Sequence, residues 1–240
     1  MRIYIGWDKR EPHAALVAAS SLRRHSSASL EIIELKLTHP HVRRRYWRQF
    51  TTEHGQRFDS VDGKHFSTDF SFSRFLIPSI QGYRGWCVFC DCDFLFRGDI
   101  AELADIIDDK YAVMVVKHDH KPKNVKKMDG MVQASYDRKN WSSFVLWNCG
   151  HPAHRGKITP VEVNEMPGSW LHTFAWLKDE EIGEIPEEWN WLVNISPTTK
   201  APKDTDPKGV HFTEGGPWFE EYREVPYADE WWEELRDYRS

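Results

Sequence analysis

Hydrophobic and polar positions along the chain follow two periods, that of a strand and that of a helix. Residues 2–7 and 30–37 are short, largely apolar runs typical of strands, and an alanine-rich helical pattern that begins near Pro12 lies between them. A strand, a helix and a second strand in this order predict a right-handed βαβ unit, which is the start of an α/β sheet.

The same patterns predict the remaining elements. The run from Trp86 to Phe96 is almost continuously apolar and is interrupted by two aspartates, which is typical of a central strand buried on both faces. Residues 41–58 are basic and aromatic without clean periodicity, and 117–140 form a polar, lysine-rich loop of a length typical of lids and binding loops. The other predicted elements are helices over 68–80, 100–107 and 160–178, strands over 111–116, 143–147 and 209–213, and a helical tail from 219.

Composition limits the class of protein. The chain has 240 residues, a length that predicts one domain, and its content of 40% hydrophobic and 29% charged residues excludes a disordered chain. The unusual feature is aromatic, because the chain has 12 Trp, 13 Phe and 8 Tyr. Trp combines a large flat apolar face with one N–H donor, so this surplus indicates either a stiff core or stacking platforms in a binding site.

The charge and the cysteine content argue against several classes of partner and compartment. The formal net charge is −5, whereas proteins that bind nucleic acid or anionic membranes are usually basic. The sequence contains no run of 18 apolar residues, the length that a membrane-spanning helix requires. The chain begins with a strand-like run in place of a signal peptide. The four cysteines are too few for a disulfide framework. We therefore expect a soluble, cytoplasmic protein.

Asp91-Cys92-Asp93 carries the strongest chemical signal, because it places two carboxylates within the buried run. Two carboxylates cannot both stay unpaired in apolar surroundings, whereas at the carboxyl edge of an open α/β sheet they face the crevice where ligands bind. Mg²⁺ and Mn²⁺ prefer carboxylate oxygens and would bridge such a pair to a substrate diphosphate. The structural alternative is an exposed turn whose aspartates cap the next element.

Further motifs lie on both sides of these aspartates. Ser73-Arg-Phe-Leu-Ile-Pro78 precedes Val88-Phe-Cys-Asp-Cys-Asp-Phe-Leu-Phe96, and Gly98-Asp-Ile-Ala-Glu-Leu103 follows. This order of an arginine-bearing helix, a strand with Asp-x-Asp and a short helix resembles glycosyltransferase family 8, of the bacterial or phage type. His211-Phe-Thr-Glu-Gly-Gly-Pro-Trp218 resembles the His-x-x-Gly-x-x-Pro-Trp segment of that family, and the first strand ends in a matching Asp8.

The resemblance implies an α/β fold of GT-A type, a Rossmann-like mixed central sheet flanked by helices. It implies a single catalytic domain over residues 1–240. Its expected parts are a nucleotide- and metal-binding half over 1–116, an acceptor-side half over 117–218 and a C-terminal helical tail over 219–240.

The resemblance also implies the residues that bind the donor. The catalytic residues and ligands of Mn²⁺ or Mg²⁺ would be Asp91, Asp93 and His211. The residues that would contact the donor, a UDP-sugar, are Trp7, Asp8, Arg74, Gly215 and Gly216. A divalent ion at this place would offset the repulsion between the donor diphosphate and the two aspartates, and glycines would let backbone N–H groups approach the phosphates.

Two positions depart from the family pattern. The lysine that usually precedes Pro-Trp is Gly216 here, so Lys126, Lys127 or Lys139 would have to reach the diphosphate. The usual Asp-Gln pair is absent, and Ser169-Trp-Leu-His172 stands in that region. The candidate residues for binding the sugar or the acceptor are His118, Asp119, Lys127, Ser142, Asn148, Asn190 and Trp218.

We therefore predict a metal-dependent glycosyltransferase that moves a hexose from a nucleoside-diphosphate sugar to a saccharide or another hydroxyl acceptor, with retention as the resemblance implies. One alternative is a nucleotidyltransferase, which would need a Gly-rich basic loop after the first strand. The other is a non-catalytic module that binds nucleotide sugars or glycans. Six tryptophans lie beside the predicted site segments, which favours a sugar-handling cleft as the reason for the surplus: Trp7, Trp141, Trp147, Trp189, Trp191 and Trp218.

Three other features have a functional and a structural interpretation. Cysteines 87, 90 and 92 could indicate zinc, but side chains on one strand alternate between its faces, so buried packing is favoured. The basic segment 43–48 would suit an anionic acceptor or a lipid-linked phosphate, and is otherwise a solvated face, so peripheral membrane contact stays open. The stripe of Trp231, Trp232 and Leu235 predicts core packing, because the polar face of that helix is acidic.

Overall fold

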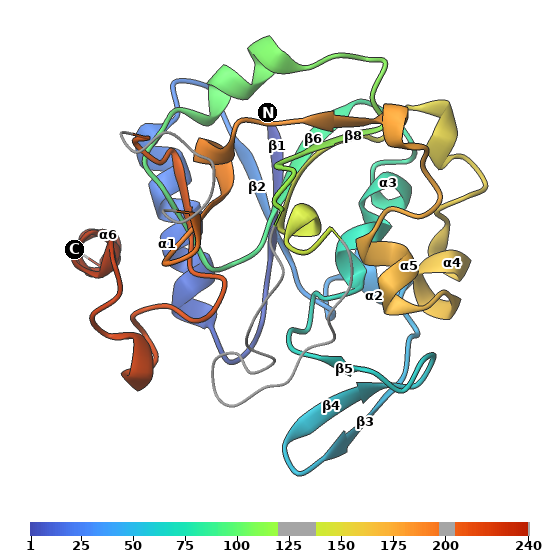
Figure 1. Cartoon of the computed structure of the whole chain (residues 1–240), viewed down its shortest axis with the longest axis horizontal. Coiled ribbons are helices and arrows are strands. Elements are labelled where there is room, and N and C mark those ends of the chain that lie inside the picture. Colours follow the sequence, from blue (N-terminus) through green and yellow to red (C-terminus); the bar gives the residue numbers. More distant parts are fainter. Residues whose placement is uncertain (120–137, 197–204, 240) are drawn as a thin grey trace.

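In the part of the chain that the structure describes, the strands form three sheets (Figure 1). The computed structural model describes residues 1–119, 138–196 and 205–239. The central sheet contains, in spatial order, β10 (Ile182–Glu184), β8 (Val113–Val115), β9 (Phe144–Asn148), β6 (Trp86–Cys90), β1 (Arg2–Gly6) and β2 (Glu31–Leu35). The second sheet contains β11 (Trp191–Leu192), β12 (Gly209–His211) and β7 (Phe94–Phe96), and the third contains β3 (Phe50–Glu53), β4 (Gln56–Asp59) and β5 (His65–Phe66). The α-helices are α1 (Pro12–His25), α2 (Pro40–Arg43), α3 (Ile77–Ile80), α4 (Pro160–Glu165), α5 (Gly168–His172) and α6 (Ala228–Arg239).

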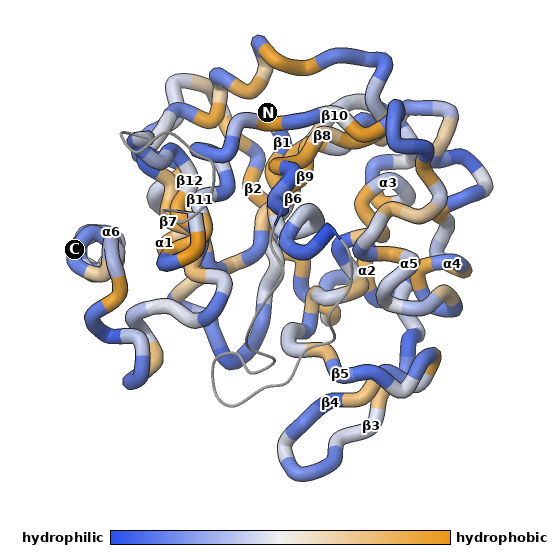
Figure 2. The backbone as a smooth tube through the Cα atoms, viewed as in Figure 1, coloured by the Kyte–Doolittle hydropathy of each residue, from blue (hydrophilic) through white to orange (hydrophobic). Residues whose placement is uncertain are grey.

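The central sheet confirms the predicted α/β class. Strand β1 pairs in parallel with both β2 and β6, and α1 makes the connection from β1 to β2 that the alternation of strand, helix and strand predicts. Strand β9 runs antiparallel between β6 and β8, so the sheet is mixed. Strands β8 and β9 are hydrophobic in the backbone trace (Figure 2), and the residues of β6, β8 and β9 are almost all buried, as expected of strands covered on both faces.

Helix α1 joins the central sheet to the second sheet. Pro12 lies in its first turn, and small alanines on its buried face let it approach the strands closely. The hydroxyl of Ser21 donates to the carbonyl of Val17 and accepts from the backbone N–H of Phe96 in β7. On the other side, Trp231 and Leu235 of α6 pack in one cluster with Val17. The predicted stripe of the tail is therefore core packing, as the acidic polar face of that helix indicates.

The run from Trp86 to Phe96 is two strands, and its prediction as one strand is wrong. Strand β6 ends at Cys90 in the central sheet, and β7 begins at Phe94 in the second sheet, where it pairs antiparallel with β12. The three residues between the strands are Asp91, Cys92 and Asp93, and Cys92 is buried. The apolar pattern continues through the break because both strands are buried, so hydrophobicity alone does not mark the change of sheet.

The basic-aromatic segment forms a helical turn and most of the third sheet, which the sequence pattern did not predict. Strands β3 and β4 form a hairpin that projects from the body (Figure 1), and β5 pairs with β4. The guanidinium of Arg48 donates to both carboxylate oxygens of Asp59 at 2.8 and 2.5 Å, and both side chains are buried. Arg48 is thus a structural residue, whereas Arg43 and Arg44 are exposed.

Two predicted helices are shorter than expected. Residues 68–80 contain a 3₁₀ turn over Ser73–Leu76 followed by α3, and 160–178 contain α4 and α5 with a break between them. Pro167 lies at that break, and a proline disfavours helical geometry at the residue before it. The predicted strands 111–116, 143–147 and 209–213 correspond to β8, β9 and β12, and 100–107 is a 3₁₀ helix over Ile100–Ile106.

The tryptophan surplus is explained by packing more than by a cleft, which corrects the sequence-based interpretation. Trp147 is buried in a cluster of rings with Phe75, Phe174 and Trp176. Trp189 is buried parallel to Phe144. The direction of β9 explains why Trp147 lies away from the aspartates. Strand β9 runs away from them and carries Trp147 to the far end of β6, opposite Cys87.

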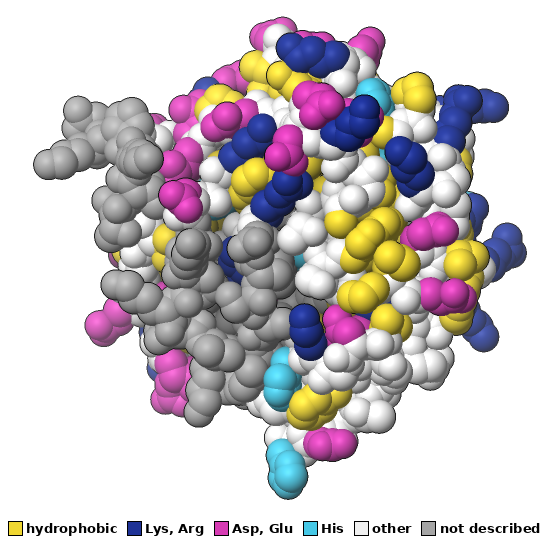
Figure 3. Space-filling model, turned by 45° about the vertical axis from the view of Figure 1, so that its right-hand side comes forward, with side chains coloured by type: hydrophobic (Ala, Val, Ile, Leu, Met, Phe, Trp, Pro, Cys, Tyr) yellow, Lys and Arg dark blue, Asp and Glu magenta, His cyan; other side chains and the backbone are white. Residues whose placement is uncertain are grey.

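Charges of both signs are interspersed on the face that Figure 3 shows, with hydrophobic side chains among them. Within the described ranges, no helix combines the length and the apolar character that crossing a bilayer requires.

One buried histidine gives the fold a defined pH response. His154 is fully buried, its Nε2 donates to the carbonyl of Ala112, and its Nδ1 accepts from the indole of Trp176, so the ring is neutral. Burial lowers the pKa of His154 to about 4. The unfolded chain binds a proton here below about pH 6.5 and the folded chain does not, so stability is lost as the pH falls from 6.5 toward 4.

We predict that this histidine contributes about 2 kcal/mol to the loss of unfolding free energy between pH 7 and pH 5, at up to about 1.36 kcal/mol per pH unit. Urea unfolding at both pH values, with the wild type and His154→Gln compared, measures it. The variant should be less stable at pH 7 but should lose less stability at pH 5. His25→Gln, which changes an exposed histidine, is the control, and an equal pH response of the wild type and His154→Gln would contradict the prediction.

Candidate functional site

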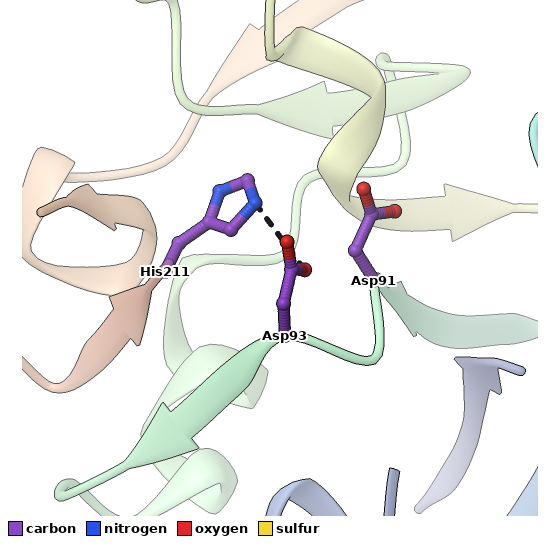
Figure 4. Close-up of side chains that lie close together, drawn as sticks. All are labelled: Asp91, Asp93 and His211. Carbon is purple, nitrogen blue, oxygen red and sulfur yellow. Dashed lines mark ion pairs between the residues drawn. The ribbon is translucent and has the colours of Figure 1, made fainter. Parts of the chain in front are cut away.

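The carboxyl edge of β6 brings Asp91, Asp93 and His211 together (Figure 4). One ligand atom from each residue lies within 4.8 Å of the others. Because Cys92 is buried in the core, the residues on either side of it turn their carboxylates to the opposite side, where both point the same way. His211 ends β12, and the antiparallel pairing of β12 with β7 places it opposite Phe94, with the two rings stacked at 4.5 Å. The two sheets therefore meet at this cluster.

The hydrogen bonds of Asn190 place a proton on Nδ1 of His211 and so define its neutral tautomer. The amide nitrogen of Asn190 donates to the carbonyl of Asn140 and to the hydroxyl of Ser143, at 3.3 and 3.0 Å. Its amide oxygen therefore faces His211 Nδ1 at 2.8 Å, so Nδ1 carries the proton. The Nε2 lone pair of a neutral His211 then points at a carboxylate oxygen of Asp93, 3.4 Å away.

Arg74 fixes the other aspartate. Its Nη1 donates to Asp91 Oδ1 at 2.6 Å and to the carbonyl of Ser142 at 2.8 Å, and its Nε donates to the carbonyl of Phe70. The buried guanidinium lies over the ring of Phe89. Arg74 thus orients Asp91, because an arginine held at several points orients the carboxylate that it binds. The predicted contact of Arg74 with the donor stays a prediction.

The residues of this cluster fit a divalent cation. Two carboxylates and one neutral imidazole are a donor set for Mn²⁺ or Mg²⁺, and the hydrogen bond that His211 Nδ1 donates to the Asn190 oxygen is typical of metal-bound histidines. A lone pair that faces a carboxylate oxygen in a buried place is unfavourable unless a cation or a proton lies between them. The three residues predicted as metal ligands are therefore arranged as such ligands would be.

A cavity that is open to solvent extends from the aspartates to the third sheet and α5. Its wall combines aromatic rings with both signs of charge. The charged and histidine side chains among the lining residues are Glu11, Asp62, Lys64, His65, Arg74, Asp91, Asp93, Lys139 and His172. The apolar and hydroxyl residues include Phe66, Phe70, Phe72, Ser142, Ser143 and Ser169.

The cavity contains residues that the sequence analysis singled out and others that it missed. Ser142 lines the wall, and its hydroxyl lies 2.8 Å from His172 Nδ1. Lys139, one of three lysines suggested as a substitute for the family lysine, also lines it and is buried. His172, Lys64 and Glu11 were not predicted. His172 could have been found from the sequence, because it stands where the family's Asp-Gln pair is absent. Lys64 could not, because the hydrophobic pattern around it did not indicate a sheet.

Several predicted acceptor residues lie elsewhere. Asn148 ends β9 opposite Trp86, at the far end of β6 from the aspartates, and its amide binds the carbonyls of Asp109 and Tyr111. We leave Asn148 out of the site for this reason. Asn190 orients His211 and is fully buried, so its contacts are those of a positioning residue.

The remaining acceptor candidates have other surroundings. His118 is buried with its Nδ1 4.0 Å from a carboxylate oxygen of Glu187, and Asp119 is exposed. Neither residue is among those lining the cavity. Trp218 packs on Phe212 and on Trp231 of α6. Lys127 lies outside the described residues, as does Lys126.

The predicted donor residues near the chain start and end have close-packed environments. Asp8 is fully buried, and its carboxylate accepts from the guanidinium of Arg10 and from the backbone N–H of Asp69. Burial raises the pKa of Asp8, but the hydrogen bonds and charge of Arg10 outweigh it and hold that pKa below its usual value. Trp7 is half-buried beneath the ammonium of Lys36. A base or ribose contact of Asp8 or Trp7 stays a prediction.

Close packing against aromatic rings explains why glycine occupies positions 215 and 216. A Cβ on Gly216 would lie 2.0 Å from the ring of Trp218, and one on Gly215, whose φ is +147°, would lie 2.5 Å from the ring of Tyr222. Larger residues are excluded at both positions, and an approach of their backbone to phosphate stays a prediction.

The four cysteines are buried thiols. Cys87 Sγ lies 3.6 Å from Cys149 Sγ, and burial raises the pKa of Cys90 and Cys92 well above the usual value. The thiolate that zinc requires is therefore disfavoured at these two positions.

Comparison with known proteins identifies the fold. No protein-family model matches the chain. Solved structures with the same fold include the bifunctional glycosyltransferase WbbM, at 17% identity and a TM-score of 0.58, and the glycosyltransferase GlyE of Streptococcus pneumoniae, at 16% and 0.59. These matches cover 98% of this chain but 49% and 59% of WbbM and GlyE, so the chain spans about half to three-fifths of their length. LgtC matches over 99% of this chain and 96% of its own, at 13% identity and a TM-score of 0.59.

These neighbours have the GT-A-type fold, which confirms the predicted architecture of a mixed sheet flanked by helices. The relationship to one protein is much closer. Protein CDI of Arabidopsis thaliana is 46% identical over 239 residues, which cover 100% of this chain and 87% of that protein. The chain therefore belongs to the family of Protein CDI.

Proposed function

We propose that this chain is a metal-dependent glycosyltransferase that transfers a hexose from a nucleoside-diphosphate sugar, UDP-linked in our proposal, to a hydroxyl of a saccharide or another acceptor. The observation that carries the proposal is the convergence of Asp91, Asp93 and His211 beside the cavity, on a GT-A-type fold. LgtC, which shares the fold, was solved as a galactosyltransferase in complex with donor and acceptor sugar analogues, which supports the proposal.

In this proposal each residue of the cluster has a defined task. Asp91, Asp93 and His211 would hold Mn²⁺ or Mg²⁺, which when bound would act as a Lewis acid on the departing nucleoside diphosphate. Arg74 keeps Asp91 oriented, and Asn190 keeps the His211 lone pair directed at the same point. Both bonds exist before any ligand arrives, so the arrangement costs little reorganisation on binding.

We assign the diphosphate contact of the missing family lysine to Lys139. This side chain is buried and lines the cavity together with both aspartates. The next residue, Asn140, has a left-handed backbone with φ 67°, and its carbonyl accepts from the backbone N–H and hydroxyl of Ser143. This tight turn ties Lys139 to the start of β9, beside Asp91.

The acceptor would enter from the side of the third sheet and α5. Ser142 and His172 form a polar pair in the wall between the aspartates and that entrance, and we propose that they hydrogen-bond hydroxyls of the transferred sugar or the acceptor. Retention of configuration remains part of the proposal, and the anomeric configuration of the product, observed by NMR, tests it.

We predict that Asp93→Asn lowers turnover of the donor about 100-fold or more, since a Lewis acid contributes several kcal/mol and 1.36 kcal/mol is tenfold in rate. A panel of UDP-sugars assayed with Mn²⁺, Mg²⁺ or EDTA measures hydrolysis and transfer. Asp105→Asn, which removes an exposed carboxylate, should behave as the wild type. Release of pyrophosphate from a nucleoside triphosphate and a sugar phosphate would favour a nucleotidyltransferase, and sugar binding without turnover under any condition would favour a non-catalytic module.

Removal of the Asn190 hydrogen bond should weaken the metal site without removing a ligand. Loss of an outer partner of a metal-bound histidine typically costs about 10- to 100-fold in metal affinity, so Asn190→Leu should weaken Mn²⁺ binding by that factor. Calorimetric titration of Mn²⁺ into the donor-free protein measures it. Asn148→Ala, a change at another buried asparagine, is the matched control, and equal Mn²⁺ affinities of Asn190→Leu and the wild type would contradict the assignment.

Lys139→Ala should raise the KM for the UDP-sugar about tenfold or more, because a hydrogen bond to a charged group contributes about 1.5–3 kcal/mol. Lys139→Arg should retain most of the affinity, since it keeps the positive charge. Lys110→Ala, at an exposed lysine, serves as the control. An unchanged KM in Lys139→Ala would assign the diphosphate contact to another residue.

A further inference from the structure

A row of rings continues from the cavity wall onto the projecting hairpin. Phe72 lies 6.1 Å from the ring of His172, Phe66 lies 5.2 Å from Phe72, and Phe50 lies 5.5 Å from Phe66, measured between ring centroids. Phe72 and Phe66 line the cavity and are buried, whereas Phe50 is 47% exposed. The aromatic wall that begins beside Ser142 and His172 thus ends on an open surface.

The strand register explains why Phe50 lies on this side of the third sheet. Phe50 is opposite Asp59, and Arg57, two residues before Asp59 on β4, is opposite Phe66. Side chains two residues apart on a strand share a face, so Phe50, Arg57 and Phe66 all lie on the face toward the body. The guanidinium of Arg57 lies 5.6 Å from the Phe50 ring centroid and 5.9 Å from that of Phe66, and its ion pair with Asp69 anchors it.

Polar groups lie along the same stretch of wall. Asp62 and Lys64, in the turn between β4 and β5, and His65 of β5 line the cavity. The carboxylate of Asp62 accepts from the backbone N–H groups of Lys64 and of Gly168, which begins α5, so it is fixed in place. At the lower end of Figure 3, where Figure 1 shows β3 and β4, hydrophobic and histidine side chains are exposed together.

Apolar rings beside a fixed carboxylate and beside ammonium and imidazole groups are the chemistry that binds sugars, because a pyranose ring has an apolar face and a rim of hydroxyls. We propose that Phe50, with Phe66 behind it, is an outer subsite that stacks on a second or later sugar ring of an oligosaccharide acceptor. This inference rests on the proposed function and names the acceptor class, a glycan chain longer than one sugar. The support for this proposal is the unbroken row of ring contacts that leads from His172 in the cavity wall to Phe50.

The test compares two aromatic residues of equal exposure. Trp47 is 46% exposed and is not among the residues that line the cavity, whereas Phe50 is 47% exposed and contacts a lining residue. With the UDP-sugar that the wild type turns over and Mn²⁺ present, kcat/KM is measured for glucose, for maltose to maltohexaose and for cellobiose to cellohexaose. Wild type, Phe50→Ala, Phe50→Trp and Trp47→Ala are assayed, together with hydrolysis of the donor alone.

We expect kcat/KM of the wild type to rise with chain length in at least one series. Phe50→Ala should raise the KM for the longer acceptors and so reduce that gain about five- to tenfold. This factor corresponds to the loss of an aromatic contact of about 1–1.4 kcal/mol. It should leave donor hydrolysis and transfer to glucose unchanged. Phe50→Trp should keep the gain, and Trp47→Ala should match the wild type.

Four results would overturn the subsite. They are no gain with chain length in the wild type, an intact gain in Phe50→Ala, equal losses in Phe50→Ala and Trp47→Ala, and a change of molecular mass in light scattering for Phe50→Ala, which would indicate contact with a second copy. Failure of the proposed function is a separate observation, namely that the wild type with Mn²⁺ consumes none of the UDP-sugars even without an acceptor.

Discussion

The structure depends on the way the chain passes from the central sheet to the second sheet within three residues. Strand β6 ends at Cys90 and β7 begins at Phe94, and buried Cys92 anchors the connection in the core. Both aspartates are thereby fixed at the point where the sheets diverge. The pairing of β7 with β12 then delivers His211 from a distant part of the sequence. The cluster can form only when both sheets are in place, so the geometry of the site is a property of the packed core.

The charges around this connection are arranged to favour a cation. Arg74 binds Asp91 from the buried side, and the hydrogen bond from His211 Nδ1 to Asn190 orients the imidazole with its Nε2 toward Asp93. The cavity is lined by four carboxylates, those of Glu11, Asp62, Asp91 and Asp93, against three cations, Lys64, Arg74 and Lys139. The resulting formal negative charge raises the local affinity for a positive ion. The same charge would repel a diphosphate on its own. Cation and diphosphate should therefore depend on each other for binding.

Local patterns predicted the βαβ start, the buried character of β6 and the Asp-x-Asp pair, because these depend on neighbours in sequence. The direction of β9 could not be predicted in the same way. Its antiparallel course puts Ser143 beside Asp91 and carries Asn148 to the opposite edge, so a residue expected in the site lies far from it. The third sheet was missed because β3 is exposed along its whole length, without an apolar face to indicate a strand. Its position depends on the buried pair of Arg48 with Asp59, a contact that no periodicity reveals.

That buried ion pair has a consequence for how the two ends of the cavity are built. A buried pair contributes little net stability because desolvation offsets its attraction, but loss of one partner is costly, so it acts mainly to specify position. Arg48 also donates to the carbonyls of Val163 and Met166, which ties the hairpin to the segment before α5. The hairpin is therefore held by these polar contacts at its base and by the packing of Phe50 on Phe66, whereas the aspartates are held by the core between the two sheets. Substitutions on the outer strand can alter the entrance of the cavity without disturbing the cluster at β6, so the two ends of the site can change independently.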